Sequence, residues 1–378
     1  MRRIGVMVLG LCFCALAMGA SALAEELSNY ELTRRIAELE KNQGISCVAA
    51  AWGDRLALSG LFEAEAGYES VDYADSVRED EDASDVVLAT MELGLDAMVN
   101  DYVSGQLLLL WEEDDTEPVD LDEGFITLTG GASCPAYVSA GKMYVPFGNF
   151  ESNMVSDPLT LELAETRESA VTLGVEAKGF YGAVYLFNGD ADEFDGDSHV
   201  DHYGAHAGFA METEAFNLGM GASYIDNITD ADAWEGFFEA LEDESEDGVA
   251  LDDYVEGVGA HAIMSMGPFI VIAEYITALD EVEFVRDSDG STLGAVAEVS
   301  AWNAEFGYSF ALGGNPAIAA VAYQGSDDAG DFLPETRLMG SFGVEIYEAT
   351  SLALEYFHDE FENDDEADGI TAQLAVEF

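Results

Sequence analysis

The chain ends with the stretch GITAQLAVEF, residues 369–378, in which apolar and polar side chains alternate except at Ala375. Side chains of an extended strand point to opposite faces with a period of two, so this pattern gives the strand one apolar and one polar face. The apolar face holds Ile370, Ala372, Leu374, Val376 and Phe378. The polar face holds Thr371, Gln373 and Glu377. The stretch therefore predicts a half-buried β-strand that ends on an aromatic residue.

Two fold classes compete for this pattern, a transmembrane β-barrel and a soluble β-sandwich with an ordinary edge strand. An alternating C-terminal strand that ends on an aromatic residue resembles the closing strand of bacterial outer-membrane barrels. Phe378 is accordingly the predicted signal for the barrel assembly machinery. Similar alternation recurs along the chain, as in LALSGLFEAEAGY (56–68), where Leu58 and Phe62 oppose Ser59 and Glu63. Such segments of about ten residues between turns are typical of a transmembrane barrel, and their small or acidic polar faces favour a lumen.

Turn residues separate sixteen such segments along the chain. The connections between the segments are alternately short and long. Outer-membrane barrels have an even number of strands, short turns at the periplasmic end and long loops outside. The sequence thus predicts an all-β, antiparallel transmembrane barrel over residues 46–378, with fourteen and eighteen strands as alternatives. A barrel of about sixteen strands leaves an aqueous channel. The predicted strands are 56–70, 85–98, 102–113, 121–131, 136–147, 167–177, 180–188, 201–212, 216–226, 254–266, 268–279, 295–311, 316–325, 335–347, 350–359 and 368–378.

The first 45 residues lie outside this barrel. MRR, a short apolar run and the ALA before Glu25 predict a signal peptide over residues 1–24. Residues 25–45 predict a short periplasmic helix, in which Leu32, Ile36 and Leu39 form an apolar seam too short for an assured coiled coil. Bundling in a trimer of barrels, contact with peptidoglycan and simple spacing explain this helix equally well.

The charge of the chain predicts the kind of solute that the channel admits. There are 77 acidic residues against 12 Lys and Arg, which gives a formal net charge of −65. An acidic, water-filled vestibule concentrates cations and repels anions, and the lack of a basic patch excludes a nucleic-acid partner. Solvation of the loops and adaptation to a saline habitat are alternative reasons for the acidity. The predicted lumen carboxylates are Glu63, Glu65, Glu92, Asp96, Glu305, Glu345 and Glu355.

The connection GKMYVPFGNFESNMVSDPLTLELAETRESAV, residues 141–171, is long and less acidic than the other long loops. Its apolar PLTLEL segment suits a loop that folds inward and narrows the pore; the alternative is a loop that covers the outside of the barrel. We expect Lys142 and Arg167 to face the acidic wall across this constriction. The predicted constriction residues are Lys142, Glu162, Glu165 and Arg167.

The same region carries a resemblance to a known family. GKMYVPFGNFESNMVSDPLTLELAETRESA, followed by GFYGAVYLFNGD at 179–190, resembles the LbtU-like siderophore porin family, most specifically over residues 137–190. The resemblance implies an outer-membrane barrel associated with uptake of ferric siderophore. It assigns no ligand-contacting residue in this chain.

Cysteine and histidine placement bears on disulfides, metals and catalysis. Cys47 and Cys134 both fall on the predicted periplasmic side, where the environment is oxidising, so we predict that they form a disulfide. His202 and His206 share a strand face but lie ~13 Å apart at ~3.3 Å per residue, too far for one ion. We therefore expect no specific metal site, no cofactor beyond loose Ca²⁺ binding by acidic loops, and no enzymatic activity.

Two functions follow for a bacterial outer-membrane barrel of this kind. The first is passive, cation-preferring passage of small solutes, linked by resemblance to ferric siderophore. The second is a structural protein that tethers the envelope through its N-terminal helix. The expected partners are outer-membrane lipid, the barrel assembly machinery, small solutes or ferric siderophore, and two further copies in a homotrimer.

Overall fold

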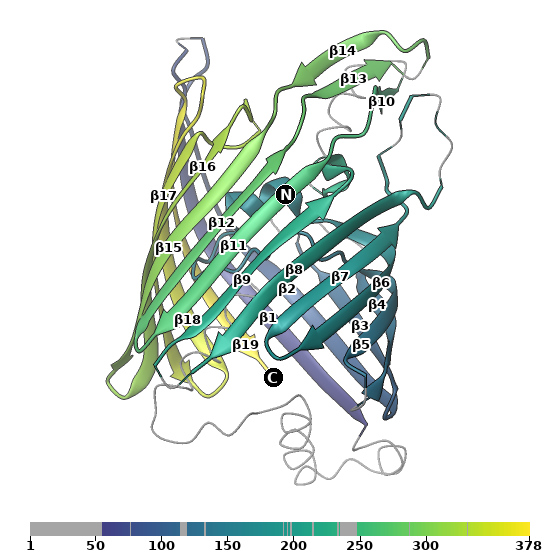
Figure 1. Cartoon of the computed structure of the whole chain (residues 1–378). Coiled ribbons are helices and arrows are strands. Elements are labelled where there is room, and N and C mark those ends of the chain that lie inside the picture. The colour runs from purple at the N-terminus through teal and green to yellow at the C-terminus, as the bar shows by residue number, and fades with distance from the viewer. Residues whose placement is uncertain are drawn as a thin grey trace.

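Sixteen antiparallel strands close into a barrel, in which β1 pairs with β2 on one side and with β19 on the other (Figure 1). The computed structural model describes residues 55–378 apart from positions 76, 114–118, 132–133, 192, 195, 197–198, 214, 233, 235–247, 287 and 331. The predicted signal peptide, the predicted helix and Cys47 lie outside the described residues. The barrel strands are β1 (Leu56–Asp72), β2 (Glu81–Asn100), β3 (Val103–Trp111), β4 (Asp120–Thr129), β5 (Ala136–Tyr144), β6 (Arg167–Ala177), β7 (Phe180–Phe187), β8 (His202–Glu212), β9 (Asn217–Ile225), β11 (Gly257–Met266), β12 (Phe269–Ala278), β15 (Ser300–Leu312), β16 (Asn315–Asp327), β17 (Thr336–Tyr347), β18 (Thr350–Glu360) and β19 (Glu366–Glu377).

The predicted assignment of faces is confirmed. The apolar residues of the alternating strands are exposed on the outside of the barrel, with 54% of Leu58 and 49% of Leu354 accessible. Their polar neighbours point inward, and Gln373 donates a 3.0 Å hydrogen bond to Glu65 across the β1–β19 seam. An apolar exterior around a polar interior is the arrangement that a barrel in lipid requires.

The C-terminal residue completes the seam between the first and last strands. Phe378 N–H donates to the Gly60 carbonyl at 3.0 Å, and Gly60 N–H donates to the Phe378 carbonyl at 2.9 Å. The Phe378 ring stacks on Phe62 with centroids 6.2 Å apart and covers Gly60, where a Cβ would meet the ring at 2.4 Å. A glycine at position 60 is therefore part of how the terminal aromatic packs.

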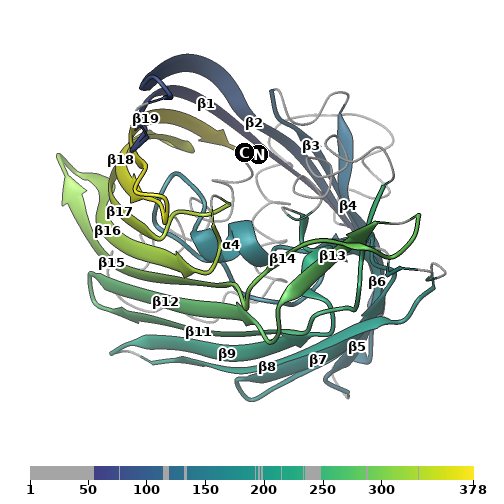
Figure 2. The ribbon, with the colours of Figure 1, turned by 90° about the horizontal axis from the view of Figure 1, so that it is seen from above.

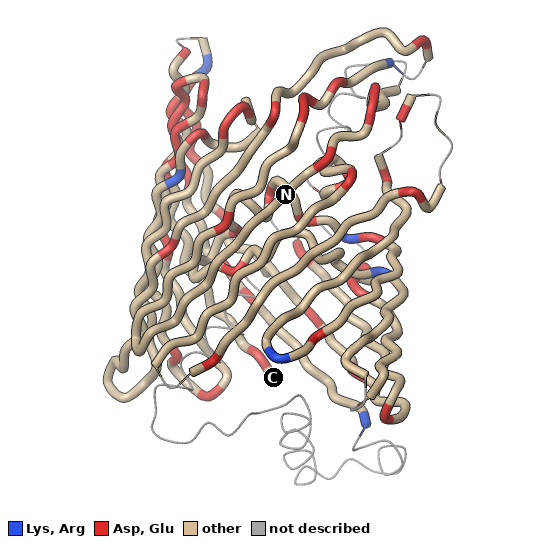
Figure 3. The backbone as a smooth tube through the Cα atoms, viewed as in Figure 1, with Lys and Arg blue, Asp and Glu red and all other residues tan. Residues whose placement is uncertain are grey.

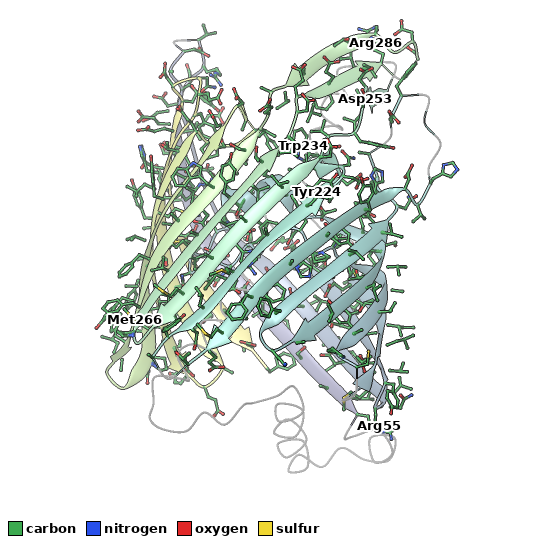
Figure 4. The ribbon with its side chains drawn as sticks, in the orientation of Figure 1. Arg55, Tyr224, Trp234, Asp253, Met266 and Arg286 are labelled. Atoms are coloured by element: carbon green, nitrogen blue, oxygen red, sulfur yellow. The ribbon has the colours of Figure 1, made fainter. Side chains whose placement is uncertain are left out.

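The two ends of the barrel differ in the length of their connections. One end carries short turns such as Lys178–Gly179 and Gly313–Gly314, in which positive φ angles of 56–102° reverse the chain tightly. The other end carries the long loops. Figure 4 places Asp253 and Arg286 at this loop end, and Arg55 and Met266 at the short-turn end.

One element at the loop end differs from the prediction. A three-stranded sheet of β10 (Val249–Leu251), β13 (Val282–Arg286) and β14 (Thr292–Val296) rises above the barrel (Figure 1). The predicted strand 295–311 is consequently wrong at its start, because its first residues belong to β14 and β15 begins at Ser300. An Asp289–Gly290 turn, a strong hairpin signal, connects β13 and β14.

Helices are few in the described part of the chain. Those with fully described bounds are the six-residue α4 (Leu159–Ala164) and the single 3₁₀ turn η2 (Ile228–Asp230). Neither is long and apolar enough to pass through a membrane.

Candidate functional site: the lumen and the loop that crosses it

The connection between β5 and β6, residues 145–166, folds into the barrel; we call it the lumen loop. Its helix α4 contacts β12, β15 and β16, and Figure 2 shows α4 inside the ring of strands. Apolar Leu159 and Leu163 of α4 are buried in a core with Phe147 of the same loop. The predicted inward fold is confirmed, and burial of the apolar PLTLEL segment explains it.

Glu274 of β12 holds the start of the lumen loop. Its two carboxylate oxygens accept hydrogen bonds from the main-chain N–H groups of Asn149 at 2.6 Å and Phe150 at 2.9 Å. The hydroxyl of Thr160 in α4 donates to the same carboxylate at 3.0 Å. One side chain of the wall thus joins two separate parts of the loop.

Glu305 of β15 holds the middle of the loop. Its carboxylate accepts the Asn153 N–H at 2.7 Å, the Asn153 side-chain amide at 3.1 Å and the Ser152 hydroxyl. Asn303 of the same strand donates a further bond at 3.0 Å. Four donors therefore converge on this one carboxylate.

Glu355 of β18 and Gln324 of β16 hold residues 155–159 of the lumen loop. Glu355 accepts the main-chain N–H groups of Val155 and Ser156 and the Ser156 hydroxyl. Gln324 accepts the Leu159 N–H at 3.0 Å. The lumen loop is therefore bonded to four strands that form one side of the barrel.

These contacts change the role of two predicted pore carboxylates. Glu305 and Glu355 lie on the lumen wall as expected, but loop donors surround their charges. Glu274 has the same role and was missed by the sequence analysis. The available signal was a lone carboxylate within the otherwise apolar FIVIAEYITA of β12, because a buried charge requires hydrogen-bond donors.

The opposite side of the lumen carries its own carboxylates. β3 and β4 stand eight places from β12 and β15 around the ring of sixteen strands and so face the wall that holds the loop; β1 and β2 continue this acidic side, β1–β4, toward β19. Their inward side chains include four predicted residues and two more. These are Glu63, Glu65, Glu92, Asp96, Asp122 and Glu123. Asp157 of the lumen loop lies within electrostatic reach of Glu63 and Glu112 on this wall. Figure 3 shows acidic residues in the barrel and gathered toward the loop end.

The predicted role of Lys142 and Arg167 is wrong. Lys142 follows the outward alternation of Val138 and Ala140 on β5, and its amine lies 3.9 Å from Asp120. Arg167 of β6 does not face an opposing wall, because its guanidinium binds Asp122 of β4, two strands away, at 2.7 Å. Carboxylates of β4 thus pair with both cations on the same side of the barrel.

Arg167 also joins the lumen loop to the loop between β9 and β11. Its Nε lies 3.9 Å from Asp232 of that loop, and its main-chain N–H donates to Asp232 at 3.1 Å. Asp232 N–H in turn donates to the Glu165 carbonyl at 2.8 Å. An ion pair and main-chain hydrogen bonds thereby hold the C-terminal end of the lumen loop.

The remaining predicted residues lie apart from one another. Glu162 lies within electrostatic reach of Arg337 of β17, and Arg337 pairs bidentately with Asp359 of β18 through two 2.8 Å bonds. Glu345 shares the inward face of β17 with Ser341 and lies near the short-turn end. Arg337 of β17 and Arg167 of β6 are thus both paired with carboxylates.

External loops pack together over one side of the barrel mouth. Trp234 donates from its indole N–H to the Leu163 carbonyl of α4 at 3.3 Å and packs on Phe332 at 5.7 Å between centroids. Figure 4 places Trp234 at the loop end of the strands. This contact ties the β9–β11 and β16–β17 loops to the lumen loop.

Charged residues of the loops show distinct pKa shifts. Burial raises the pKa of Asp230 to about 6, although His202, the Ala191 N–H and the Asn227 amide oppose this shift. Asp230 lies 3.4 Å from His202 Nδ1, so it joins the β7–β8 and β9–β11 loops. In the β1–β2 loop, hydrogen bonds from Arg78, first from its main-chain N–H and then from its guanidinium, lower the pKa of Asp75 to about 2.

The described residues were predicted to include one cysteine of a disulfide and no specific metal site. Cys134 is exposed and has no disulfide partner among the described residues, and the predicted pairing with Cys47 stays a prediction. No set of three or more His, Cys, Asp or Glu within the described ranges has the geometry to bind a metal ion.

Comparison with known proteins agrees with this architecture. The sequence profile of the family described as phosphate-selective porin O and P matches residues 92–311, more than half of the chain. A UPF0422 protein of Coxiella burnetii is 29% identical over 313 residues, which are 81% of this chain and 64% of that protein. The chain thus spans slightly less than two thirds of that relative.

Solved structures share the fold at low sequence identity. The outer-membrane channel DcaP of Acinetobacter baumannii gives a TM-score of 0.58 at 16% identity, over 85% of this chain and 97% of that one. The anion-selective porin from Comamonas acidovorans gives 0.55 at 10% identity, over 85% and 99%. The closed sixteen-stranded barrel and the profile match together show that the chain belongs to the phosphate-selective porin O and P family and is a porin of the bacterial outer membrane.

Proposed function

We propose that this porin gives small solutes passive passage across the outer membrane and prefers cations. The observation that supports this proposal most directly is the charge of β1–β4, where Glu92 and Asp96 point inward beside further carboxylates. The guanidinium groups of Arg167 and Arg337 offset little of this charge, because each is already paired. Acidic walls raise the local concentration of cations and lower that of anions.

The names of the matched family and of one structural neighbour refer to selectivity for phosphate or anions, whereas we propose a preference for cations. Recognition of phosphate uses unpaired Arg and Lys side chains that can approach its oxygens. Arg167 is occupied by Asp122, and Lys142 lies on the outer face of β5. The described residues of this lumen therefore suit cations better than phosphate.

A planar-bilayer recording under a KCl gradient tests the proposal. We expect steady conductance with a cation-selective reversal potential. We expect the double variant Glu92→Gln/Asp96→Asn to move that potential toward zero at nearly unchanged conductance. An anion-selective wild-type pore, or a variant with an unchanged potential, would contradict the cation preference.

Ferric siderophore is a second candidate solute, supported by the resemblance of residues 137–190 to siderophore porins. Adding ferric siderophores to the same recording tests it, since a specific solute should block ion current at micromolar concentration.

A homotrimer and a tether through residues 25–45 also stay proposals. Chemical cross-linking in detergent tests the first, and binding to peptidoglycan with and without those residues tests the second.

A further inference from the structure

We propose that Glu274, Glu305 and Glu355 are positioning residues of the pore, which set its width by holding the lumen loop across the lumen. This inference rests on the proposed function of the barrel as a pore. The three side chains come from β12, β15 and β18, and each accepts bonds from a different part of residues 149–156. They act on the loop and through it on the solute path.

The lumen loop depends on these carboxylates because residues 149–156 have no partner strand. Residues 149–156 form neither helix nor strand, so their main-chain N–H groups lack regular secondary-structure partners. Buried N–H groups require acceptors, and the loop lies against the wall where water has limited access. Five of the N–H groups in this segment donate to the three glutamates: those of Asn149, Phe150, Asn153, Val155 and Ser156.

A carboxylate is the group that fits this task. It offers two oxygens that accept several hydrogen bonds, and charge-assisted bonds are about twice as strong as neutral ones. A glutamine offers one acceptor oxygen and turns an NH₂ toward the remaining donors. Gln324 shows the difference within this protein, since it accepts a single loop N–H, that of Leu159.

Width and ion selectivity should consequently depend on different residues. Loop donors surround Glu274, Glu305 and Glu355, so a change at one of these residues should displace the loop and thereby alter the width of the path. Glu65 supplies a matched comparison, because it also points inward but bonds to Gln373 of the wall instead of the loop. Neutralising Glu65 or Glu305 removes one lumen carboxylate, but only the second change removes loop acceptors.

The experiment compares full-length Glu305→Gln with Glu65→Gln after heat-modifiable mobility has shown that both fold. Hydrogen exchange at the Asn153 amide and exclusion of polyethylene glycols of graded size from the open channel are measured in both. We expect Asn153 exchange to rise about tenfold or more in Glu305→Gln, since a hydrogen bond to a charged group is lost. The exclusion limit should shift in Glu305→Gln and stay at the wild-type value in Glu65→Gln.

Equal Asn153 exchange and equal exclusion limits in the two variants would overturn the inference. If Glu305→Gln fails to fold, Ser152→Ala removes one donor from the loop side and should give the same changes at smaller size. A wild-type pore without cation preference would refute the proposed selectivity and leave this comparison valid. A loop that stays in place in Glu305→Gln would refute the inference and leave the selectivity untouched.

Discussion

Leu354 shows how a single side chain reports the orientation of a strand. It lies near the middle of β18 on the outer face, whereas its neighbours Ala353 and Glu355 point toward the lumen. Outward residues of a barrel meet lipid, and inward residues meet water or the lumen loop. The penalty for a charged side chain should therefore alternate along the strand.

Leu354→Arg should lower the free energy of unfolding by about 2–4 kcal/mol, because it places a cation near the bilayer midplane. Reversible unfolding in guanidinium with phospholipid vesicles measures this change. Ala353→Arg is the control, and we expect a smaller loss since its side chain enters the polar lumen. Equal losses for the two variants would show that the assigned faces are wrong.

Asp230 should make the contact between the β7–β8 and β9–β11 loops depend on pH. Its pKa in the folded protein, about 6, lies above the ordinary value of 3.8, so the folded state holds the proton more tightly. The contact therefore gains stability as pH falls from about 6 to about 4, and loses it as pH rises. Asp230→Asn should remove most of this dependence.

Exchange of the Phe194 amide measures this contact, because that amide donates to the Leu251 carbonyl at 2.8 Å across the two loops. Rates are corrected for the intrinsic pH dependence of exchange. Protection that increases with pH in the wild type would reject the predicted sign.

At the scale of elements, Arg167 connects β6, β4 and the β9–β11 loop. Its side chain is only 10% exposed, and its guanidinium lies 2.7 Å from Asp122. Tyr144 donates a further bond to Asp122 at 2.9 Å. Removing one partner of a buried ion pair is costly, because the other charge stays buried.

We expect Arg167→Met to cost about 3–5 kcal/mol of folding free energy, since it leaves the Asp122 carboxylate buried without its guanidinium. Chemical denaturation in detergent micelles measures the loss. The double variant Arg167→Met/Asp122→Asn should recover much of it because the stranded charge is gone. A double variant as unstable as the single one would show that packing, and not charge, gives Arg167 its role.

At the scale of the whole molecule, selectivity should depend on ionic strength. The cation preference comes from many carboxylates around an aqueous lumen, and mobile ions screen such charges within about 10 Å at 0.1 M salt and about 3 Å at 1 M. The cation-to-anion permeability ratio should therefore fall as the mean KCl concentration rises from 0.1 to 1 M. Reversal potentials at a fixed concentration ratio measure it. A ratio that does not change would indicate selection by direct coordination.

Predictions from sequence succeeded where local alternation carries the information. The sixteen barrel strands, their faces and the closing role of the terminal strand follow from a period of two and from turn residues. The predictions failed where a side chain's partner lies on another strand, distant in sequence. Lys142 and Arg167 were expected to face the acidic wall across the constriction, but they pair with Asp120 and Asp122 of β4, where a bulge interrupts the pairing with β3.

The sequence by itself determined the barrel, its apolar exterior and its acidic interior, because these depend on which residue types alternate along each strand. Only the tertiary structure decided how the interior is used. Glu274, Glu305 and Glu355 lie more than 100 residues from the loop donors that they accept. No local pattern records such pairs, since closing the barrel brings them together and burying the loop's N–H groups makes their carboxylates necessary.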